Sequence, residues 1–470
     1  MRSSKLARLF FSLSKLEHRA LKKFVRSPYY NKRGDVVSLF DYLVKIDPSD
    51  YKSLQKEVVY AKVFPKEKYN SDKFDYAMSF LLKSIEQFLI EQRTSRDALK
   101  VQIAMVQEYR RLGLPKHFAK AFRYAQKKHL EQPYRDTRFH RYDFRLEVEQ
   151  YEFESEQQRS VPTNLQTLNN KLDLQYIAQK LRHSCLSLAH QSVYKTEYDT
   201  GLLDMVFLYI EQTPKMLEYP AISLYYYYYK AVTSPEKEAF YQKFKPILFA
   251  ETDRFAHAEM RDLYLLAINY CVKKSNEGQQ QYYQELFDLF RVGIEKNILM
   301  DNDGRLHHFT FKNAVRMAVR LKELDWASNF VEDYEAYIDP LHQDAYVNYA
   351  KAEILVAKKE YQTALVLLQQ IDYKDLQLNL GAKMMLLKIY YALDEYDVLE
   401  SFLSSFQTFI RRKDVLGYHR ENYKNIIKFT QKVLTISPYN KKAQDQLREQ
   451  IETTKPLTEK AWLLQQLDQV

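Results

Sequence analysis

The chain has 470 residues, of which only 8 are glycine and 13 are proline, and its 71 basic and 61 acidic side chains leave a net charge of +10. β-Sandwiches, β-barrels and collagen-like chains use more glycine and proline than this, so these classes are excluded. Hydrophobic residues make up 46% of the chain. That is enough apolar material for a large core and excludes global disorder.

The positive charge is concentrated in two short segments. Residues 1–33 carry +9 and residues 109–145 carry +8, whereas residues 34–108 and 146–470 carry −1 and −6. Local excesses of this size are typical of proteins that bind polyanions. The basic character of the chain therefore belongs to two segments in its first third, which are the candidates for binding an anionic partner.

Helical periodicity runs through the N-terminal hundred residues. The first predicted helix begins at Ser14, because Glu17 three residues later completes a capping box, and it ends near Arg26. Further helices are expected from Gly34, from a cap at Ser53, and from Ser71 to about Arg93.

Later helices are separated by breaks that mostly lie 15–35 residues apart, of which Gly113 with Pro115 and Pro133 are the first. This is the rhythm of helical hairpins joined by short loops. No segment alternates apolar and polar residues as a half-buried strand does. We predict an all-α protein in three parts: a basic helical domain at 1–108, a basic helical hairpin at 109–160, and a helical repeat array at 161–470.

A repeat is visible near the C-terminal end. Trp326, Tyr361 and Tyr396 each follow an acidic residue and are spaced 35 apart. In the middle copy, Ala352 and Ala364 stand nine residues before and three residues after Tyr361, where two crossing helices require small side chains. Asn329 and Leu399 replace the small residue in the first and last copies.

These features resemble tetratricopeptide repeats, which have a period of about 34 residues. The resemblance implies an α-solenoid of antiparallel helical hairpins, forming a right-handed superhelix behind the basic N-terminal region. It also implies a non-enzymatic scaffold whose concave surface binds a protein or peptide.

Five consecutive tyrosines occupy positions 225–229, and on a helix they cover every face. One interpretation is a helix buried between its neighbours. The other is an aromatic lining of the concave surface. Under the second interpretation, the candidate protein-partner residues are Tyr225, Tyr226, Tyr227, Tyr228 and Tyr229.

Cationic side chains form helical stripes in both basic segments, without the interleaved glutamates of a neutral exposed helix. They are either solvated faces or a site for RNA, DNA or an anionic protein surface. The candidate polyanion-binding residues are Lys15, Arg19, Lys22, Lys23, Arg26, Lys116, Lys120, Arg123, Lys127, Arg138, Arg141 and Arg145.

Residues 53–93 resemble the helical part of a winged-helix DNA-binding domain. Val58 and Val59 would lie on its first helix, and the turn Phe64–Pro65 would precede the second. With repeats behind it, such a domain resembles bacterial transcription activators of the antibiotic-regulatory type, which implies a nucleic-acid-associated regulator as the alternative function. The segment departs from that pattern in having acidic side chains, such as Asp72, on its candidate recognition helix, and in lacking a wing after Leu89.

Motifs for chemistry are missing from the sequence. It has no phosphate-binding glycine loop, no HExxH and no CxxC, so we expect no catalytic, cofactor or metal site and do not expect an enzyme. Cys185 and Cys271 are expected to be buried, reduced thiols, which fits a cytoplasmic protein. No apolar run reaches the roughly 18 residues of a membrane span.

Overall fold

The computed structural model describes residues 1, 3–157, 162–194, 196–234, 238–369, 375–412 and 417–469. The predicted all-α fold is confirmed. These residues form 23 α-helices and three short 3-10 helices, and their only β pairing is an isolated bridge between Met300 and Leu306.

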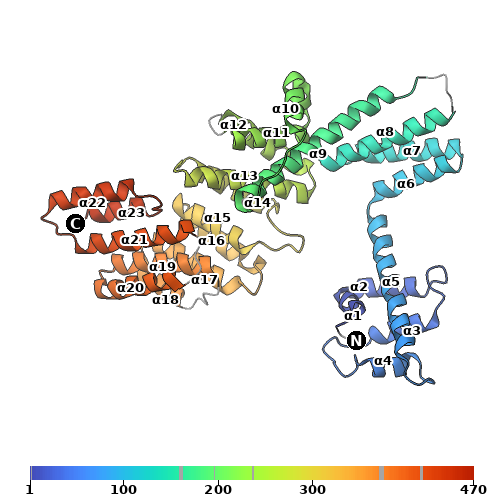
Figure 1. The fold of residues 1–470 in the computed structure, drawn as a ribbon, viewed down its shortest axis with the longest axis horizontal. Helices are drawn as coiled ribbons and strands as arrows, with labels where there is room; N and C mark the ends of the chain where they lie inside the picture. Colours follow the sequence, from blue (N-terminus) through green and yellow to red (C-terminus); the bar gives the residue numbers. More distant parts are fainter. Residues whose placement is uncertain are drawn as a thin grey trace. The chain divides into compact units, whose positions relative to one another are not determined.

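The chain divides into two compact units (Figure 1). The N-terminal unit comprises Met1–Pro133 and Thr137–Tyr176, and the C-terminal unit comprises Tyr134–Asp136 and Ile177–Val470. The division falls within α9 (Leu165–Tyr194). The boundary predicted between residues 160 and 161 lies outside the described residues.

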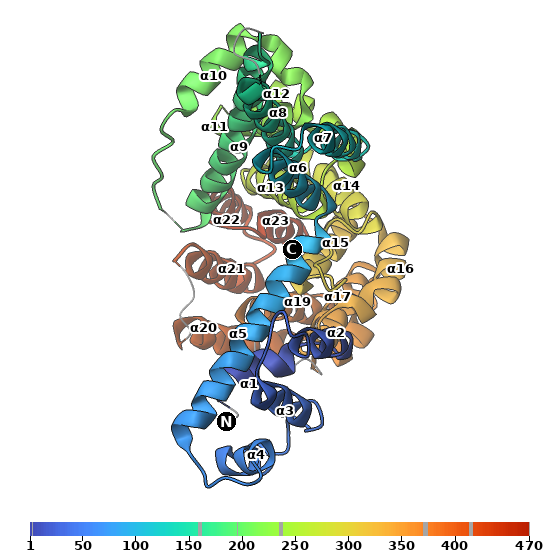
Figure 2. The same cartoon turned by 90° about the vertical axis from the view of Figure 1, so that its right-hand side faces the viewer.

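The N-terminal unit is built around one long helix, α5 (Ser71–Arg96). Three shorter helices pack against it and a fourth packs against α3, as Figure 2 shows. These four are α1 (Lys5–Ser12), α2 (Lys15–Val25), α3 (Gly34–Leu43) and α4 (Lys56–Val63). Their apolar faces form one core with the N-terminal part of α5.

The predicted helix starts are right at three of the four positions. Ser14 and Glu17 form the expected capping box of α2, and α3 begins at Gly34. Ser53 does not cap α4, which begins at Lys56, because the Ser53 hydroxyl instead donates to the side chain of Asp50 at 2.6 Å. Helix α5 begins at Ser71, as predicted, and its N-cap is Asn70. Helix α1 was not predicted.

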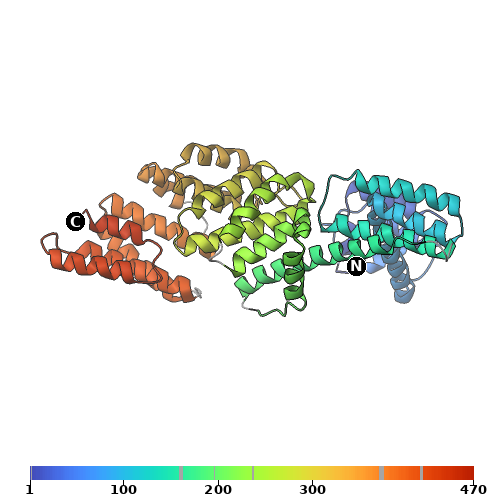
Figure 3. The same cartoon turned by 90° about the horizontal axis from the view of Figure 1, so that it is seen from above.

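Three further helices follow α5 in the N-terminal unit, before the first part of α9. They are α6 (Ala98–Arg111), α7 (Pro115–Leu130) and α8 (Thr137–Gln157), and each packs against the other two (Figures 1 and 3). Their shared core is small and combines aliphatic with aromatic side chains, and the Phe118 and Phe153 rings are stacked at 3.8 Å.

The C-terminal unit continues with helices arranged mostly in pairs. Its elements after α9 are α10 (Leu203–Gln212), η1 (Pro214–Glu218), α11 (Pro220–Thr233), α12 (Ala239–Ala250), η2 (Thr252–Arg254), α13 (His257–Asn276), α14 (Tyr282–Glu295), α15 (His308–Arg320), α16 (Leu324–Tyr334), η3 (Glu335–Tyr337), α17 (Gln343–Ala357), α18 (Tyr361–Gln369), α19 (Leu376–Ala392), α20 (Tyr396–Arg412), α21 (Gly417–Thr435), α22 (Lys441–Thr453) and α23 (Lys460–Leu467).

Successive helices of this unit form hairpins that pack on one another. Helices α11 and α12, α13 and α14, α15 and α16, α17 and α18, and α19 and α20 are paired in this way. The first helix of one pair also contacts the first helix of a later pair at α11–α13, α15–α17 and α17–α19. Each pair therefore buries part of its apolar surface against its neighbour as well as within itself.

Five of the hairpin turns share one backbone cap. The helices α6, α13, α15, α17 and α19 are each followed by a residue with positive φ: Gly113, Gly278, Lys322, Lys359 and Asp394 respectively. In each case the next N–H donates to the carbonyl five residues back, as Glu360 does to Leu355 at 2.9 Å. This is the Schellman geometry, and three of the five turns use it without glycine.

The shared cap corrects the predicted repeat register. Ala364 and Leu399 each stand five residues after their positive-φ residue and are fully buried, and the residue at that place in the first copy is Ala327, also fully buried. The predicted equivalent, Asn329, is exposed. Tyr361 and Tyr396 begin α18 and α20, whereas Trp326 is the third residue of α16, so aligning the aromatic residues shifted the first copy by two.

Overpacking tests this register. We expect Ala327→Trp and Ala364→Trp each to lower the free energy of unfolding by about 1–3 kcal/mol, because a large ring cannot fit at a closely packed crossing. Asn329→Trp and Val366→Trp are controls at exposed positions of the same two helices. Equal melting temperatures for Ala327→Trp and Asn329→Trp would show that the corrected register is wrong.

The turn conformation predicts a stabilising substitution. Lys359 has φ 63°, which costs an L-residue about 1 kcal/mol relative to glycine. Lys359→Gly should therefore raise the melting temperature, whereas Lys358→Gly should lower it, because Lys358 caps α17 with ordinary helical φ. Thermal unfolding of the two variants measures both signs, and a destabilised Lys359→Gly protein would contradict the geometry.

Candidate functional site

Cationic side chains from three helices surround one cavity of about 610 Å³ in the N-terminal unit. Arg93 and Arg96 come from the last turn of α5, Lys100 comes from the first turn of α6, and α8 supplies the rest. The α8 residues are Arg138, Arg141, Tyr142 and Arg145. Asp97, between α5 and α6, is the one acidic residue in the lining.

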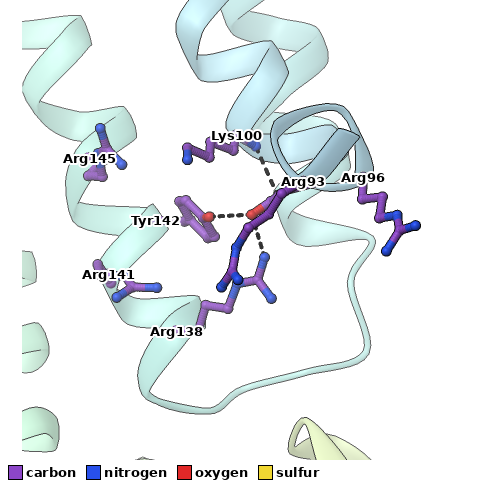
Figure 4. A pocket seen from close by; sticks show the side chains of 8 residues that line it. Arg93, Arg96, Lys100, Arg138, Arg141, Tyr142 and Arg145 are labelled. Carbon is purple, nitrogen blue, oxygen red and sulfur yellow. Dashed lines mark hydrogen bonds and ion pairs between the residues drawn. The ribbon is translucent and has the colours of Figure 1, made fainter. Parts of the chain in front are cut away.

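Spacing along α8 places its three arginines on one face. Arg138, Arg141 and Arg145 stand at i, i+3 and i+7, as the sequence analysis predicted, and they are neighbours on a helix surface. Tyr142 is buried beside them. Figure 4 shows Lys100 and Arg93 reaching toward α8 from the opposite side, while Arg96 points away.

Asp97 fixes the junction between α5 and α6. It ends α5 and is also the N-cap of α6, where its carboxylate accepts a hydrogen bond from the Lys100 backbone N–H at 3.1 Å. The same carboxylate accepts from the Tyr142 hydroxyl at 2.6 Å and forms an ion pair with Arg138 (Figure 4). One acidic side chain therefore ties the start of α6 to the face of α8 that carries the arginines.

The groups that contact the Asp97 carboxylate favour its ionised form. Partial burial on its own would raise the pKa of Asp97, but the hydrogen bonds from Tyr142 and Lys100, together with Arg138, lower it below its usual value. Burial and the bond to Asp97 raise the pKa of Tyr142, so its hydroxyl keeps its proton as a donor. Asp97 and Arg138 are thus both charged at neutral pH.

Most of the cavity's cations are not neutralised. Within the part of the chain that the structure describes, Arg93, Lys100 and Arg145 form no ion pair. Arg110 on α6, by contrast, is paired. It forms ion pairs with three glutamates of α8: Glu149 at 3.4 Å, Glu156 at 2.9 Å, and Glu152. Among the described residues, Arg141 and Arg145 in the first half of α8 therefore form no ion pair, whereas Glu149, Glu152 and Glu156 in its second half pair with Arg110.

The other predicted cations are exposed but do not line the cavity. On α7 these are Lys116, Lys120, Arg123 and Lys127, of which Lys127 lies 3.8 Å from Glu131. On α2 they are Lys15, Arg19, Lys22, Lys23 and Arg26, of which Arg26 pairs with Asp41 at 2.6 Å. The α8 stripe thus meets cations of α5 and α6 at the cavity, and the α7 stripe contributes none.

The consecutive tyrosines are not a free surface. Tyr225, Tyr226 and Tyr228 are 0%, 6% and 3% exposed, and Tyr227 and Tyr229 are half-buried. Their prediction as a partner-binding surface is wrong for the three buried rings, because α11 packs against η1, α12 and α13. The buried hydroxyl of Tyr225 donates to Glu259 at 3.1 Å, so this ring belongs to the core.

The candidate winged-helix segment forms two helices without a wing. Helix α5 runs on to Arg96, and no strand follows it among the residues described. Asp75, one of its acidic side chains, forms an ion pair with Lys56 at 2.7 Å.

The remaining features to consider are the two cysteines, metal-binding clusters and membrane-spanning helices. Cys185 and Cys271 are buried as predicted, and burial raises the pKa of the Cys271 thiol to about 12. Over the described residues, no group of three or more His, Cys, Asp or Glu side chains is placed to hold a metal ion. No helix found there has the length and apolarity that crossing a membrane requires.

Comparison of the chain with protein-family models, with curated proteins and with solved structures found no match.

The hydrogen bonds and ion pair of the Asp97 carboxylate predict a pH-dependent contribution to the stability of the protein. A carboxylate whose pKa is lowered by folding stabilises the native state above its unfolded pKa of about 3.9, and this contribution is lost as pH falls through the folded pKa. Asp97→Asn keeps a good N-cap but loses the charge, so we expect it to cost about 1 kcal/mol at pH 7 and almost nothing near pH 2. Thermal melts across this range measure the difference. Asp173→Asn, at an exposed site of the same unit, is the control, and a cost independent of pH would contradict the tie.

Proposed function

We propose that this protein is a non-enzymatic, nucleic-acid-associated helical-repeat protein that binds a phosphate backbone through the cavity of its N-terminal unit. The observation that carries the proposal is the lining of that cavity, which contains six cationic side chains and one carboxylate that is already bound. Clustered, unpaired arginine and lysine side chains are what phosphate binding requires.

Arginine dominates the lining, which supports phosphate over other anions. Its planar guanidinium presents paired N–H donors that match two phosphate oxygens, and five of the six cations are arginines. The exposed cations of α2 and α7 lie in the same unit and add to its positive field. A long anion would thus be attracted to the unit as a whole and held at the cavity.

The C-terminal unit is proposed to be a tetratricopeptide-like solenoid that binds a protein partner. The repeated Schellman caps and the packing of first helices against one another support the solenoid.

Exposed apolar side chains on α10 support binding of a protein partner. Helix α10 exposes Met205, Leu208 and Tyr209, and Leu202 before it is also exposed. Exposed apolar side chains clustered in this way are typical of protein interfaces.

The two free cysteines support a cytoplasmic location.

Charge reversal at the cavity tests the proposed function. We expect the triple variant Arg93→Glu, Lys100→Glu and Arg145→Glu to bind a fluorescent 20-nucleotide single strand at least tenfold more weakly than the parent protein. The slope of log affinity against log salt should fall by about 2, because three phosphate contacts are lost. Fluorescence anisotropy between 50 and 200 mM salt measures both quantities.

A matched control separates a site from general attraction. Lys116→Glu, Lys120→Glu and Arg123→Glu on α7 change the net charge by the same amount at exposed positions outside the cavity. We expect this variant to lose clearly less affinity. An equal loss in both variants would show that net charge alone drives binding, and no binding by the parent protein at low salt would overturn the proposal.

A further inference from the structure

The cations that line the basic cavity come from three helices and do not follow one line. Lys100 and Arg93 approach from one side, and Arg141 and Arg145 from the other, with Tyr142 between them (Figure 4). Its volume of about 610 Å³ is that of a small-molecule pocket. A nucleic-acid strand that only passed by would meet a stripe of charges, as α2 and α7 present, and would not need this convergence.

Charge density sets the kind of anion that this cavity matches. Each phosphodiester of a nucleic acid carries one negative charge per nucleotide, so several nucleotides would be needed to balance the lining. A terminal phosphate carries up to about two charges, and phosphates linked directly to it add theirs within the same small volume. Linked phosphates therefore bring enough negative charge into the cavity without a long strand.

Asp97 neutralises one of the cavity's cations and leaves the lining positive. Its carboxylate is the one acidic group in the lining, and it is held by Arg138, Tyr142 and the Lys100 N–H. Because the other cations give the lining a surplus of positive charge, an anion with several charges is attracted more strongly than a singly charged one. Arg93, Lys100 and Arg145, which pair with no carboxylate among the described residues, are available to bind a ligand with several charges.

We propose that the cavity binds a chain of directly linked phosphates, carried either on a free nucleotide or at the 5′ end of an RNA. This inference rests on the proposed function, because it names the part of the nucleic acid that the cavity holds. The remaining strand would then lie against the exposed cations of the same unit.

The test compares two RNAs of one sequence. A fluorescent 20-nucleotide RNA carrying a 5′-triphosphate should bind at least tenfold more tightly than the same RNA with a 5′-hydroxyl, because the triphosphate adds several charge-assisted hydrogen bonds. The double variant Lys100→Gln and Arg145→Gln should abolish this difference. The control Lys116→Gln and Lys120→Gln should keep it, and circular-dichroism melts show whether each variant is folded.

Inorganic tripolyphosphate and ATP, used as competitors, separate the possible sources of the ligand. Competition by both supports a free polyphosphate or nucleotide as ligand, and no competition beside a strong 5′-triphosphate preference supports the RNA end. Equal affinity for the two RNAs, with both weakened by the double variant, would overturn this inference and leave the proposed function intact. Binding of tripolyphosphate to the cavity with no binding of either RNA would support the inference and overturn the proposed function.

Discussion

The carboxylate of Asp97 is the contact on which the basic cavity depends. Six cationic side chains do not gather around one volume unless something offsets their repulsion. Asp97 does so while performing a structural task, because it caps α6 and accepts from Arg138 and Tyr142 of α8. Removing the Asp97 carboxylate would break its contacts with Arg138 and Tyr142 of α8, and it would leave the cations of the cavity without a counter-charge.

This arrangement leaves a definite surplus of charge. Other partly buried basic side chains of the unit pair with acidic ones, as Arg110 does with three glutamates and Lys171 does with Asp143 at 3.2 Å and Glu147 at 2.6 Å. The cavity departs from that pattern with one carboxylate for six cations. A cluster of unneutralised cations lowers the stability of the unit through self-repulsion, so its presence points to a ligand rather than to folding.

The α8 half of the cavity could be predicted from the sequence, and the α5–α6 half could not. Arg138, Arg141 and Arg145 follow helical spacing and stand out from their surroundings. Arg93, Arg96 and Lys100 were missed because they lie in residues 34–108, where acidic residues cancel the charge. A local signal was present, since Arg93, Arg96 and Lys100 surround Asp97, a good N-cap residue. What the sequence does not show is that α8 folds back onto this junction.

The repeat, like the cavity, could be predicted only in part from the sequence. The hairpin rhythm and the buried Ala352 and Ala364 were predictable, because helix crossings demand small residues. The register of the first copy was not, because the turn residues Lys322 and Lys359 adopt positive φ although lysine has no preference for it. The tyrosine run could not be assigned either, because composition does not show how many helices surround α11.

The most direct measurement of the central claim is hydrogen–deuterium exchange of the full chain with and without a 5′-triphosphorylated RNA. If the cavity is the site, amide exchange slows in the segments 93–100 and 138–145, and the segment 116–127 changes less. Slowed exchange confined to α15–α20, or no change at a saturating RNA concentration, would contradict the account.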